Sequence, residues 1–577
     1  MHLDVLIIHP PAIYDFRKIP HFPGPTSQIS LHTTAQYIQV PQGTLSVADY
    51  LDRNGFKVMV DNLGERMLYD EKFDAKSYLR SINSEVYAIE WHWYVHGQGA
   101  IEVAKLCKTL HPESLVVMGG LTATIFHEEI IRTFHFIDVV IRGEAEKPFY
   151  ELLKRYENRE KVDDSIPNIT FRNNDKIVST PIMKPSEDLD EFEFTRLDLL
   201  EPKNSIYTPG TTPHFSMSIC RGCLYNCITC GGSAYTYRRY FGREKPAFRS
   251  PEKLVEDVEK LVEQDVRCIG LLQDPRMAGK SYWEKLFSLL REEDPDVERL
   301  AMDIFRPVDE EYVQCLSRTR LPITLNISPD SGSYEVRKHQ GRDYTNEQLL
   351  ETIKLCHKYH IPVTVFFMIG LAKEDFTTIE ETWMLWEKLS SLDREAISKG
   401  IFRHLEPFIP IAGPIMGHMI QLDPGSLGFD YPEKYGYKIL YRTLREHLKI
   451  LAMPSWHQRF NYETELLNKE AIINLIYKSI EFAIQSREKY GLLNQHEIFL
   501  QRLQMNIDKF IKNEIDKIVN SYPEGERRLR LKALKYAFDF ILQYFKPIAD
   551  PYGYGGKLAQ IVEKTLEECR IIGSSLF

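Results

Sequence analysis

Short apolar runs alternate with segments of helical period over the first 145 residues of the chain. Each run is too short for a buried helix and lies between turn-forming residues, which predicts strands. The segment between the first two runs has helical spacing and ends at Gly55. The predicted strands are 5–11, 57–62, 86–91, 114–120 and 138–144. Strands that alternate with helices predict a doubly wound parallel sheet, a Rossmann-like fold in which each strand end is a candidate ligand loop.

A second alternation of strands and helices begins near residue 215. Amphipathic segments such as PEKLVEDVEKLVEQ separate its apolar runs and predict helices. The predicted strands are 215–220, 268–274, 298–305, 322–328, 361–370 and 402–408. Six strands in this order predict a partial (β/α)6 barrel rather than a closed barrel of eight.

The chain of 577 residues exceeds the size of one hydrophobic core, so several domains are expected. The pattern predicts an α/β protein in which polar, irregular sequence joins the two sheets and amphipathic helices dominate the end. The predicted parts are a Rossmann-like domain at 1–155, a connector at 156–210, a partial barrel at 211–430 and a helical domain at 431–577.

Composition and charge narrow the class of protein. A net charge of −10 argues against a chain that coats nucleic acid, so no nucleic-acid partner is expected. No apolar stretch is long enough to span a bilayer, and the first residues lack the features of a signal peptide. These observations predict a cytoplasmic enzyme.

Four of the nine cysteines are crowded between residues 220 and 230, in the run CRGCLYNCITC. Structural zinc prefers two Cys pairs separated by a longer loop, and this run has no such separation. A Cys-x3-Cys-x2-Cys loop can instead wrap three corners of an iron–sulfur cluster and leave one iron without a protein ligand. The zinc interpretation would use all four thiolates, whereas the iron–sulfur interpretation leaves Cys220 as a buried thiol or as an alternative ligand.

The spacing of Cys223, Cys227 and Cys230, after the first barrel strand and behind Arg-Gly, resembles the signature of the radical S-adenosylmethionine (SAM) superfamily. The RGCxYNCxxC form resembles the class of that superfamily that carries a cobalamin-binding domain. The resemblance implies that these cysteines hold a [4Fe–4S] cluster whose open iron binds SAM. In the family, an electron from the cluster cleaves SAM to methionine and a 5′-deoxyadenosyl radical, which abstracts hydrogen from an unactivated carbon.

The resemblance also implies a set of contacts to SAM along the barrel strands. Tyr225 lies where the family places an aromatic side chain near the adenine, and the strand near 361–370 resembles the adenine-binding motif. The family's Gly-Gly-Glu after the second strand is absent, which leaves Gln273 and Asp274 as the contacts to the methionine amine. The remaining implied contacts are Ser328, Asp330 and Ser331 for the ribose or carboxylate, and Met368 and Gly370 for the adenine.

The first domain resembles the cobalamin-binding domain of the same class. Glycines at strand ends would let a large planar ligand pack against backbone, although any tight turn favours them too. The implied cobalamin contacts are Gln42, Gly43, Gly119, Gly120, Thr122, Gly143 and Glu144. The Asp-x-His-x-x-Gly motif that supplies a lower cobalt ligand is absent, so the alternatives are His9, His92 or no protein ligand. A fold retained without cobalamin, which packs on the barrel and shapes the substrate entrance, is a further alternative.

The family resemblance implies methyl transfer from cobalamin to an unactivated carbon of a small-molecule or lipid substrate. The alternative within the class is radical carbon–carbon bond or ring formation on a lipid or isoprenoid chain, for which the apolar, Pro-rich segment 404–429 could line a channel or merely cap the barrel. A non-catalytic iron–sulfur or zinc protein is the alternative outside the class. A reductant protein such as ferredoxin or flavodoxin is the expected partner.

Overall fold

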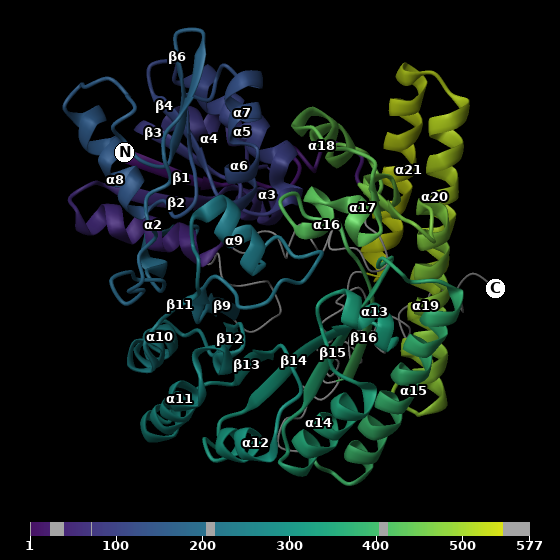
Figure 1. Cartoon of the computed structure of the whole chain (residues 1–577). Coiled ribbons are helices and arrows are strands. Elements are labelled where there is room, and N and C mark those ends of the chain that lie inside the picture. The colour runs from purple at the N-terminus through teal and green to yellow at the C-terminus, as the bar shows by residue number, and fades with distance from the viewer. Residues whose placement is uncertain (1, 23–39, 71, 204–213, 403–412, 546–577) are drawn as a thin grey trace, which may run out of the picture.

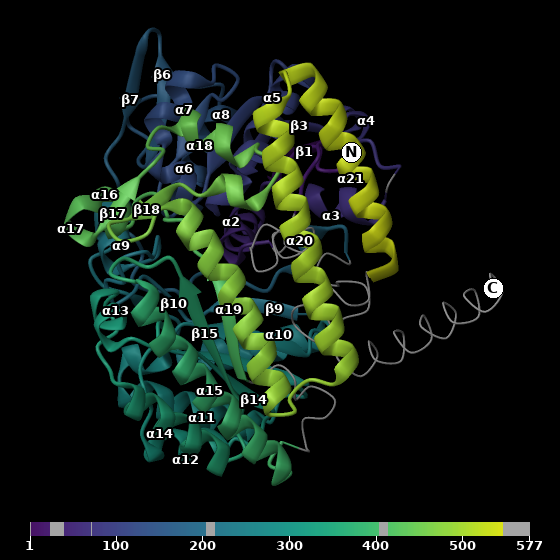
Figure 2. The ribbon, with the colours of Figure 1, turned by 90° about the vertical axis from the view of Figure 1, so that its right-hand side faces the viewer.

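The structure is a computed structural model that describes residues 2–22, 40–70, 72–203, 214–402 and 413–545. A first domain built on one sheet lies beside a second domain built on another, and three long helices near the end of the chain run alongside both (Figures 1 and 2). This arrangement confirms the predicted α/β class with two parallel sheets and a helical C-terminal region.

The first sheet has the strand order β7-β6-β5-β4-β3-β1-β2-β8, and its five central strands are parallel. These are β1 (His2–His9), β2 (Val58–Asn62), β3 (Asn83–Glu90), β4 (Leu115–Gly119) and β5 (Val139–Ile141). Each coincides with a predicted strand. The helices of this domain are α2 (Gln42–Arg53), α3 (Leu63–Tyr69), α4 (Ala75–Ser81), η1 (Tyr94–His96), α5 (Gly97–Leu110), α6 (Leu121–Ile125), α7 (His127–Thr133) and α8 (Glu146–Glu157).

Helices cover both faces of this sheet, which explains the continuous apolar run of β1. Val5 and Ile7 pack in one core with side chains of α2 and α8, whereas Leu6 and Ile8 pack in a second core with α5. A parallel strand buried on both faces reads as an unbroken apolar run. The chain turns in opposite directions on the two sides of β1, so β1 and β3 flank the topological switch point, where doubly wound sheets bind their ligands.

The prediction of an irregular connector at 156–210 was wrong for three short segments. A hairpin of β6 (Ile169–Asn173) and β7 (Lys176–Ser179) extends the first sheet beyond β5, and β8 (Leu200–Glu201) pairs with β2. Asn174 supplies the positive φ of 53° that the tight hairpin turn requires. The alternation in ITFRN and the Asn-Asp pair after it are the signals that could have predicted this hairpin.

The second sheet has six parallel strands in the order β16-β15-β14-β13-β12-β9, an open partial barrel as predicted. The strands are β9 (His214–Ser218), β12 (Cys268–Leu272), β13 (Arg299–Ile304), β14 (Ile323–Asp330), β15 (Val363–Ile369) and β16 (Gly413–Met419). The short strands β10 (Cys220–Arg221) and β11 (Ala247–Phe248) form a separate pair. The helices are α9 (Ala234–Phe241), α10 (Pro251–Glu263), η3 (Pro275–Ala278), α11 (Lys280–Glu293), α12 (Glu310–Ser317), α13 (Tyr334–His339), α14 (Asn346–Lys358) and α15 (Phe376–Ser398).

The sixth strand of this sheet lies later in the chain than predicted. The predicted strand 402–408 falls, from residue 403 on, outside the described residues, and β16 instead occupies 413–419. Residues 413–419 of the apolar segment 404–429 therefore form an edge strand. Pro414 removes a backbone donor, which is tolerated because β16 pairs on one side only.

Side chains alternate between the two faces of the barrel sheet. Phe215 and Met217 of β9 are buried against the surrounding helices, whereas His214 and Ser216 face the concave side and are partly exposed. The same alternation in β13 and β14 directs further polar side chains to the concave face, namely Arg299, Asp303, Thr324, Asn326 and Ser328. The concave face thus carries polar side chains on β9, β13 and β14 and apolar ones, Phe366 and Met368, on β15.

The C-terminal region contains three long helices, α19 (Lys469–Lys489), α20 (Gln495–Ser521) and α21 (Glu524–Phe545). Helix α19 packs on α15 and β16, and α20 packs on α19. The predicted helical domain at 431–577 also contains a small sheet of β17 (Tyr437–Ile439) and β18 (Tyr462–Thr464), which the sequence did not indicate. The short helices near it are α16 (Leu427–Asp430), α17 (Pro432–Tyr435), α18 (Leu444–Leu451) and η6 (Trp456–Arg459).

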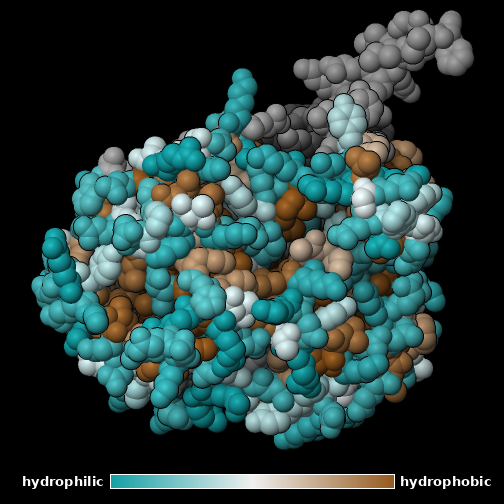
Figure 3. Space-filling model, turned by 90° about the horizontal axis from the view of Figure 1, so that it is seen from above, coloured by the Kyte–Doolittle hydropathy of each residue, from teal (hydrophilic) through white to brown (hydrophobic). Residues whose placement is uncertain are grey.

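None of the helices in the described ranges is both long and apolar enough to cross a membrane. Viewed from above, the surface carries hydrophilic side chains over most of its area, with apolar groups between them (Figure 3).

Stability should depend on pH through Asp508 of α20. Its carboxyl accepts hydrogen bonds from Trp456 and Tyr477, and burial raises its pKa from 3.8 to about 7. Between these pH values the folded chain holds a proton that the unfolded chain has released, so stability falls as pH rises. We expect the free energy of unfolding to fall by about 2 kcal/mol from pH 5 to pH 7 through this group.

The measurement is urea unfolding at both pH values for wild type and Asp508→Asn, which keeps the acceptor oxygen but cannot titrate. The difference between the two chains isolates the contribution of Asp508. Equal pH dependence in both would contradict the assignment.

Candidate functional site

The cysteine run forms a loop at the carboxyl end of the first barrel strand, between β10 and α9. Cys223 and Cys227 are partly exposed and Cys230 is exposed. Cys220 is 1% exposed, its thiol donates to the Gly222 carbonyl at 3.5 Å, and burial raises the pKa of that thiol. The loop thus presents three accessible sulfurs and keeps the fourth inside the protein.

Backbone amides point at two of the three accessible sulfurs. The Tyr225 N–H donates to Cys223 Sγ at 3.4 Å, and the Gly232 N–H donates to Cys230 Sγ at 3.3 Å. Such hydrogen bonds stabilise thiolates over neutral thiols. Within the described residues, three possible metal-ligand atoms lie within 4.8 Å of one another only in a group outside this loop. The three cysteine sulfurs are therefore not all within 4.8 Å of one another.

The loop is held from the barrel side by two close approaches. A Cβ on Gly341, whose φ is +92°, would lie 3.2 Å from the Asn226 carbonyl oxygen, so glycine is required next to the loop. The Gly231 N–H donates to Asp423 Oδ2 at 3.0 Å, and burial raises the pKa of Asp423 to about 6. Asp423 was missed in the sequence, where its only signal is the turn sequence Asp-Pro-Gly.

Gln273, proposed from the sequence as a SAM contact, has a buried acceptor atom without a hydrogen bond. It follows β12 with a φ of 73°, its N–H donates to Asp303 at 3.2 Å, and its Oε1 has no partner. Such an atom suits an ammonium donor. The neighbouring Asp274 carboxylate is instead bound by Arg276 at 2.6 Å and by the Phe305 N–H at 2.8 Å. Asp274 therefore holds the loop after β12 in place.

Asp330 is the second residue at this edge with an unpaired buried oxygen. It ends β14 with a φ of 66°; its Oδ2 accepts from Arg342 Nε at 2.5 Å and its Oδ1 has no partner. Ser331 is fully buried, and its hydroxyl contacts Thr382 at 3.2 Å. Ser328 is partly exposed on the concave face. Of the three, Asp330 and Ser328 are placed to meet a ligand.

The aromatic and apolar contacts proposed for the adenine lie at two different places. Tyr225 packs edge-on against Phe305 at 5.9 Å between ring centroids. Met368 of β15 is partly buried. Gly370 has a φ of +90°, and an added Cβ would lie 2.7 Å from the Tyr462 hydroxyl. Glycine is thus explained at 370 by backbone conformation and by packing against the C-terminal region.

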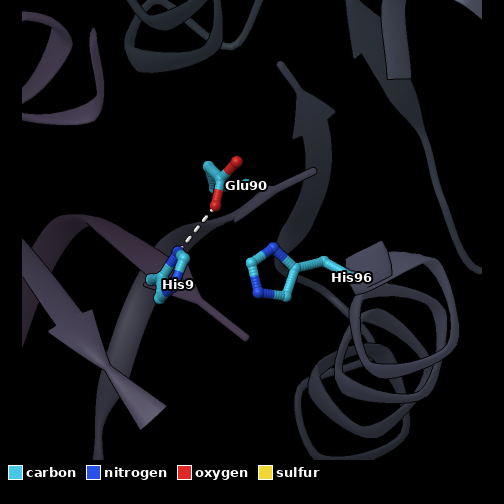
Figure 4. A group of neighbouring side chains, drawn as sticks. All are labelled: His9, Glu90 and His96. Carbon is cyan, nitrogen blue, oxygen red and sulfur yellow. Dashed lines mark hydrogen bonds and ion pairs between the residues drawn. The ribbon is translucent and has the colours of Figure 1, made fainter. Parts of the chain in front are cut away.

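At the switch point of the first sheet, three titratable side chains lie close together: His9, Glu90 and His96 (Figure 4). His9 Nδ1 lies 2.7 Å from Glu90 Oε2, and the rings of the two histidines are 4.9 Å apart. Burial alone would raise the pKa of Glu90, but the hydrogen bond with His9 and the neighbouring imidazoles lower it below its ordinary value. Glu90 also accepts the backbone N–H of His92, and burial lowers the pKa of the His92 imidazole.

His96 was missed in the sequence, and Glu90 was not connected with His9. Each lies at a different strand end or turn, and only the strand order, in which β3 is the neighbour of β1, brings them together.

Two residues proposed as cobalamin contacts join the domains instead. Gln42 Oε1 accepts the Ser218 N–H at 2.6 Å, at the end of the first barrel strand. Glu144 pairs with Arg221 at 3.1 Å and with Arg243 at 2.5 Å. Glu146 also pairs with Arg221, at 2.5 Å. Glu144 and Glu146, which follow β5, thus bind Arg221, the residue directly before Gly222 and Cys223.

The other proposed cobalamin contacts are mostly explained by backbone geometry. Gly120 and Gly143 have φ values of +111° and +70°, and the Thr122 hydroxyl donates to the His92 carbonyl at 2.8 Å. Gly119 is in ordinary contact range of the Ile141 carbonyl, 3.7 Å from an added Cβ. Gly43, at the start of α2, is the exception because an added Cβ would meet no atom of the described residues within 4 Å.

Gly120→Ala and Gly43→Ala should therefore differ in their effects on stability. The Cβ at 120 would lie 2.6 Å from the Trp91 backbone in an unfavourable φ region, so we expect a loss of about 2 kcal/mol or more. At 43 the space is open, and the change should remain within about 1 kcal/mol. Thermal unfolding of both variants checks this, and equal losses would contradict it.

Comparisons with known proteins agree with these features. The model of the radical SAM superfamily matches residues 217–383, and that of the B12 binding domain matches residues 30–153. The anaerobic magnesium-protoporphyrin IX monomethyl ester cyclase of Cereibacter sphaeroides is 25% identical over 60% of this chain and 55% of its own length. The chain thus aligns with about half the length of this curated relative.

Two solved structures share the fold across most of the chain. The radical SAM methyltransferase TsrM from Kitasatospora setae, solved with tryptophan and a SAM analogue, has a TM-score of 0.54 at 15% identity, covering 85% of this chain and 89% of its own. The cobalamin-dependent SAM radical enzyme OxsB, solved with aqua-cobalamin and SAM, has a TM-score of 0.56 at 12% identity, covering 100% and 81%. The chain thus contains a segment that matches the B12 binding domain followed by one that matches the radical SAM superfamily, which confirms the resemblance found in the sequence.

Proposed function

We propose that this chain is a cobalamin-dependent radical SAM enzyme that acts on an unactivated carbon. The observation that carries the proposal is the loop of Cys223, Cys227 and Cys230, which presents three accessible sulfurs at the carboxyl edge of an open barrel. The loop also touches the first domain through Ser218 and Arg221. A cluster held there would therefore lie next to the ligand edge of the B12-binding domain.

When bound, the [4Fe–4S] cluster would supply an electron, SAM would be the source of a carbon radical, and cobalamin would be the methyl carrier. The residues of this chain fit SAM at two points: Gln273 offers an unpaired oxygen for the ammonium group, and Asp330 offers one for a hydroxyl or ammonium donor. Arg342 fixes the orientation of Asp330. The backbone hydrogen bonds to Cys223 and Cys230 favour the thiolate form that iron requires, whereas burial raises the pKa of both thiols, so a bound metal would have to displace their protons. A reductant protein such as ferredoxin or flavodoxin would supply the electron.

The first domain fits cobalamin at the switch point of its sheet. The space that the described residues leave open at Gly43 would admit part of a large ligand, and imidazole side chains lie at the end of β1 (His9) and in η1 (His96). Gln42 and Glu144, which were also predicted as cobalamin contacts, bind the barrel through Ser218 and Arg221. Their role is to fix the distance between the two ligand edges.

Methyl transfer is the reaction that we favour, and it is supported by the fold shared with TsrM. Ring or carbon–carbon bond formation is the second candidate, because a relative named as a cyclase is 25% identical to this chain. On the concave face, the buried Nε of Arg299 has no hydrogen bond to the described residues, which supports a substrate that places a polar group there. Phe366 and Met368 of β15 add apolar side chains to the same face.

The test uses SAM with an isotope label in its methyl group. Protein reconstituted with iron, sulfide and hydroxocobalamin is reduced without oxygen and incubated with the labelled SAM. We expect the label in the corrinoid fraction together with S-adenosylhomocysteine, and 5′-deoxyadenosine as a second product. Deoxyadenosine without any label in the corrinoid would favour the ring-forming candidate. If neither labelled corrinoid nor 5′-deoxyadenosine forms, the proposal is contradicted.

A further inference from the structure

The switch-point cluster, which we define as His9, Glu90 and His96, has the composition of a metal site. Its members come from the end of β1, the end of β3 and η1. One possible ligand atom of each lies within 4.8 Å of the others, and the three side chains point toward one another (Figure 4). Two imidazoles and one carboxylate are a common ligand set for divalent first-row transition metals.

The charge of this cluster is the second observation. Glu90 is 7% exposed, and among the described residues its ion pairing involves His9 and no lysine or arginine. A carboxylate removed from water costs several kcal/mol unless a cation or donors compensate it. Buried charges in proteins are therefore paired or coordinate metals. Glu90 has His9 Nδ1 and the backbone N–H of His92 as donors, and a bound cation would add the positive charge that no lysine or arginine of the described residues supplies.

The position of the cluster is the third observation. β1 and β3 are neighbours that flank the switch point, and His9 and Glu90 are the last residues of the two strands. Ligands of doubly wound sheets bind outside the carboxyl ends of the strands at this point. The cluster thus lies at the ligand edge of the domain.

We propose that His9 and His96 coordinate a transition-metal centre at the switch point, with Glu90 as the third group of the site. The hydrogen bond of Glu90 to Nδ1 of His9 directs Nε2 of that ring toward a metal, which is how carboxylates orient metal-binding histidines. Alternatively, the metal replaces the proton between Nδ1 and the carboxylate. Two kinds of metal centre share this coordination by imidazole: a free divalent ion and the cobalt of a corrinoid. The corrinoid case rests on the proposed function.

The first arm of the test uses Co²⁺ alone. The full-length chain with Cys223, Cys227 and Cys230 replaced by Ala is stripped of metal, so that the cysteines cannot bind the ion, and is titrated with Co²⁺. Visible d–d absorption reports bound Co²⁺. If the cluster binds a free divalent ion, His9→Gln should abolish this absorption, and Glu90→Gln should weaken Co²⁺ binding about 10- to 100-fold. His111→Gln is the matched control, because His111 is a histidine of the same domain that stacks on Tyr87 away from the cluster.

The second arm uses cob(II)alamin and needs no substitution. Protein with the natural sequence is labelled with ¹⁵N-histidine, loaded with unlabelled cob(II)alamin, and examined by electron paramagnetic resonance. A histidine ligand gives doublet splitting of the cobalt lines, whereas the cobalamin's own ¹⁴N base gives triplets. His9→Gln should remove the doublets, and His92→Gln should keep them.

Either a Co²⁺ signal lost in His9→Gln or ¹⁵N doublets would support the inference. A chain that binds no Co²⁺ and whose cob(II)alamin shows triplets or no nitrogen splitting would overturn it while leaving the proposed function intact. A chain that binds Co²⁺ at the cluster but retains no corrinoid would support the inference and overturn cobalamin dependence. A chain that binds neither Co²⁺ nor a corrinoid would overturn both the inference and the proposed cobalamin dependence.

Discussion

Replacing Cys223, Cys227 or Cys230 by Ala should abolish the iron–sulfur absorption and the cleavage of SAM, each to the detection limit. These three sulfurs are accessible at the carboxyl end of the first barrel strand, and two of them accept backbone hydrogen bonds. A cluster with two protein ligands would be held at two corners only and would lose iron. Iron and sulfide content, visible absorption and 5′-deoxyadenosine formation measure the loss.

Cys220→Ala is the matched control for these variants. Its side chain is 1% exposed and bonds to the Gly222 carbonyl, so its removal should leave both the absorption and SAM cleavage in place. Loss of both properties in all four variants would overturn the assignment of three ligands and make Cys220 part of the site.

Arg221→Met should lower the free energy of unfolding by about 3 kcal/mol, near the lower end of the range for breaking a buried ion pair. The side chains of Arg221 and Glu146 are 13% and 3% exposed, and Glu144 shares the same guanidinium. Met keeps most of the length of the side chain but leaves Glu146 without its arginine and Glu144 with Arg243 alone. Because this pair joins the domains beside the cysteine loop, the variant should also retain less cluster.

Arg132→Met is the control, since Arg132 and Glu128 form a pair in the same domain with side chains 61% and 52% exposed. Exposed pairs contribute at most about 1 kcal/mol, so this variant should unfold close to wild type. Urea unfolding of both variants is the measurement. Equal losses would show that the contact between the domains does not depend on Arg221.

The central parts of both sheets could be predicted from the sequence because their strands are buried on at least one face. The apolar run of β1 and the alternation in β13 follow directly from packing against helices. The hairpin of β6 and β7 was missed because its strands are short and partly exposed. β16 was placed too early because the whole segment around it is apolar and Pro-rich.

The cysteine loop could be recognised because its chemistry depends on local spacing alone. The partners of Glu144 could not, since the arginines that bind it come from another domain. His9 was considered as a cobalt ligand from its place after β1, but its contact with Glu90 depends on strand order. Contacts between distant segments were therefore the part of the site that the sequence did not reveal.

Release of 5′-deoxyadenosine from SAM tests the central claim most directly. The full-length chain is reconstituted with iron and sulfide without oxygen, reduced, and given SAM, and the nucleoside products are separated. The account predicts 5′-deoxyadenosine from the natural sequence and none from the variant that lacks Cys223, Cys227 and Cys230. A chain that holds zinc tightly and releases no 5′-deoxyadenosine would contradict the account.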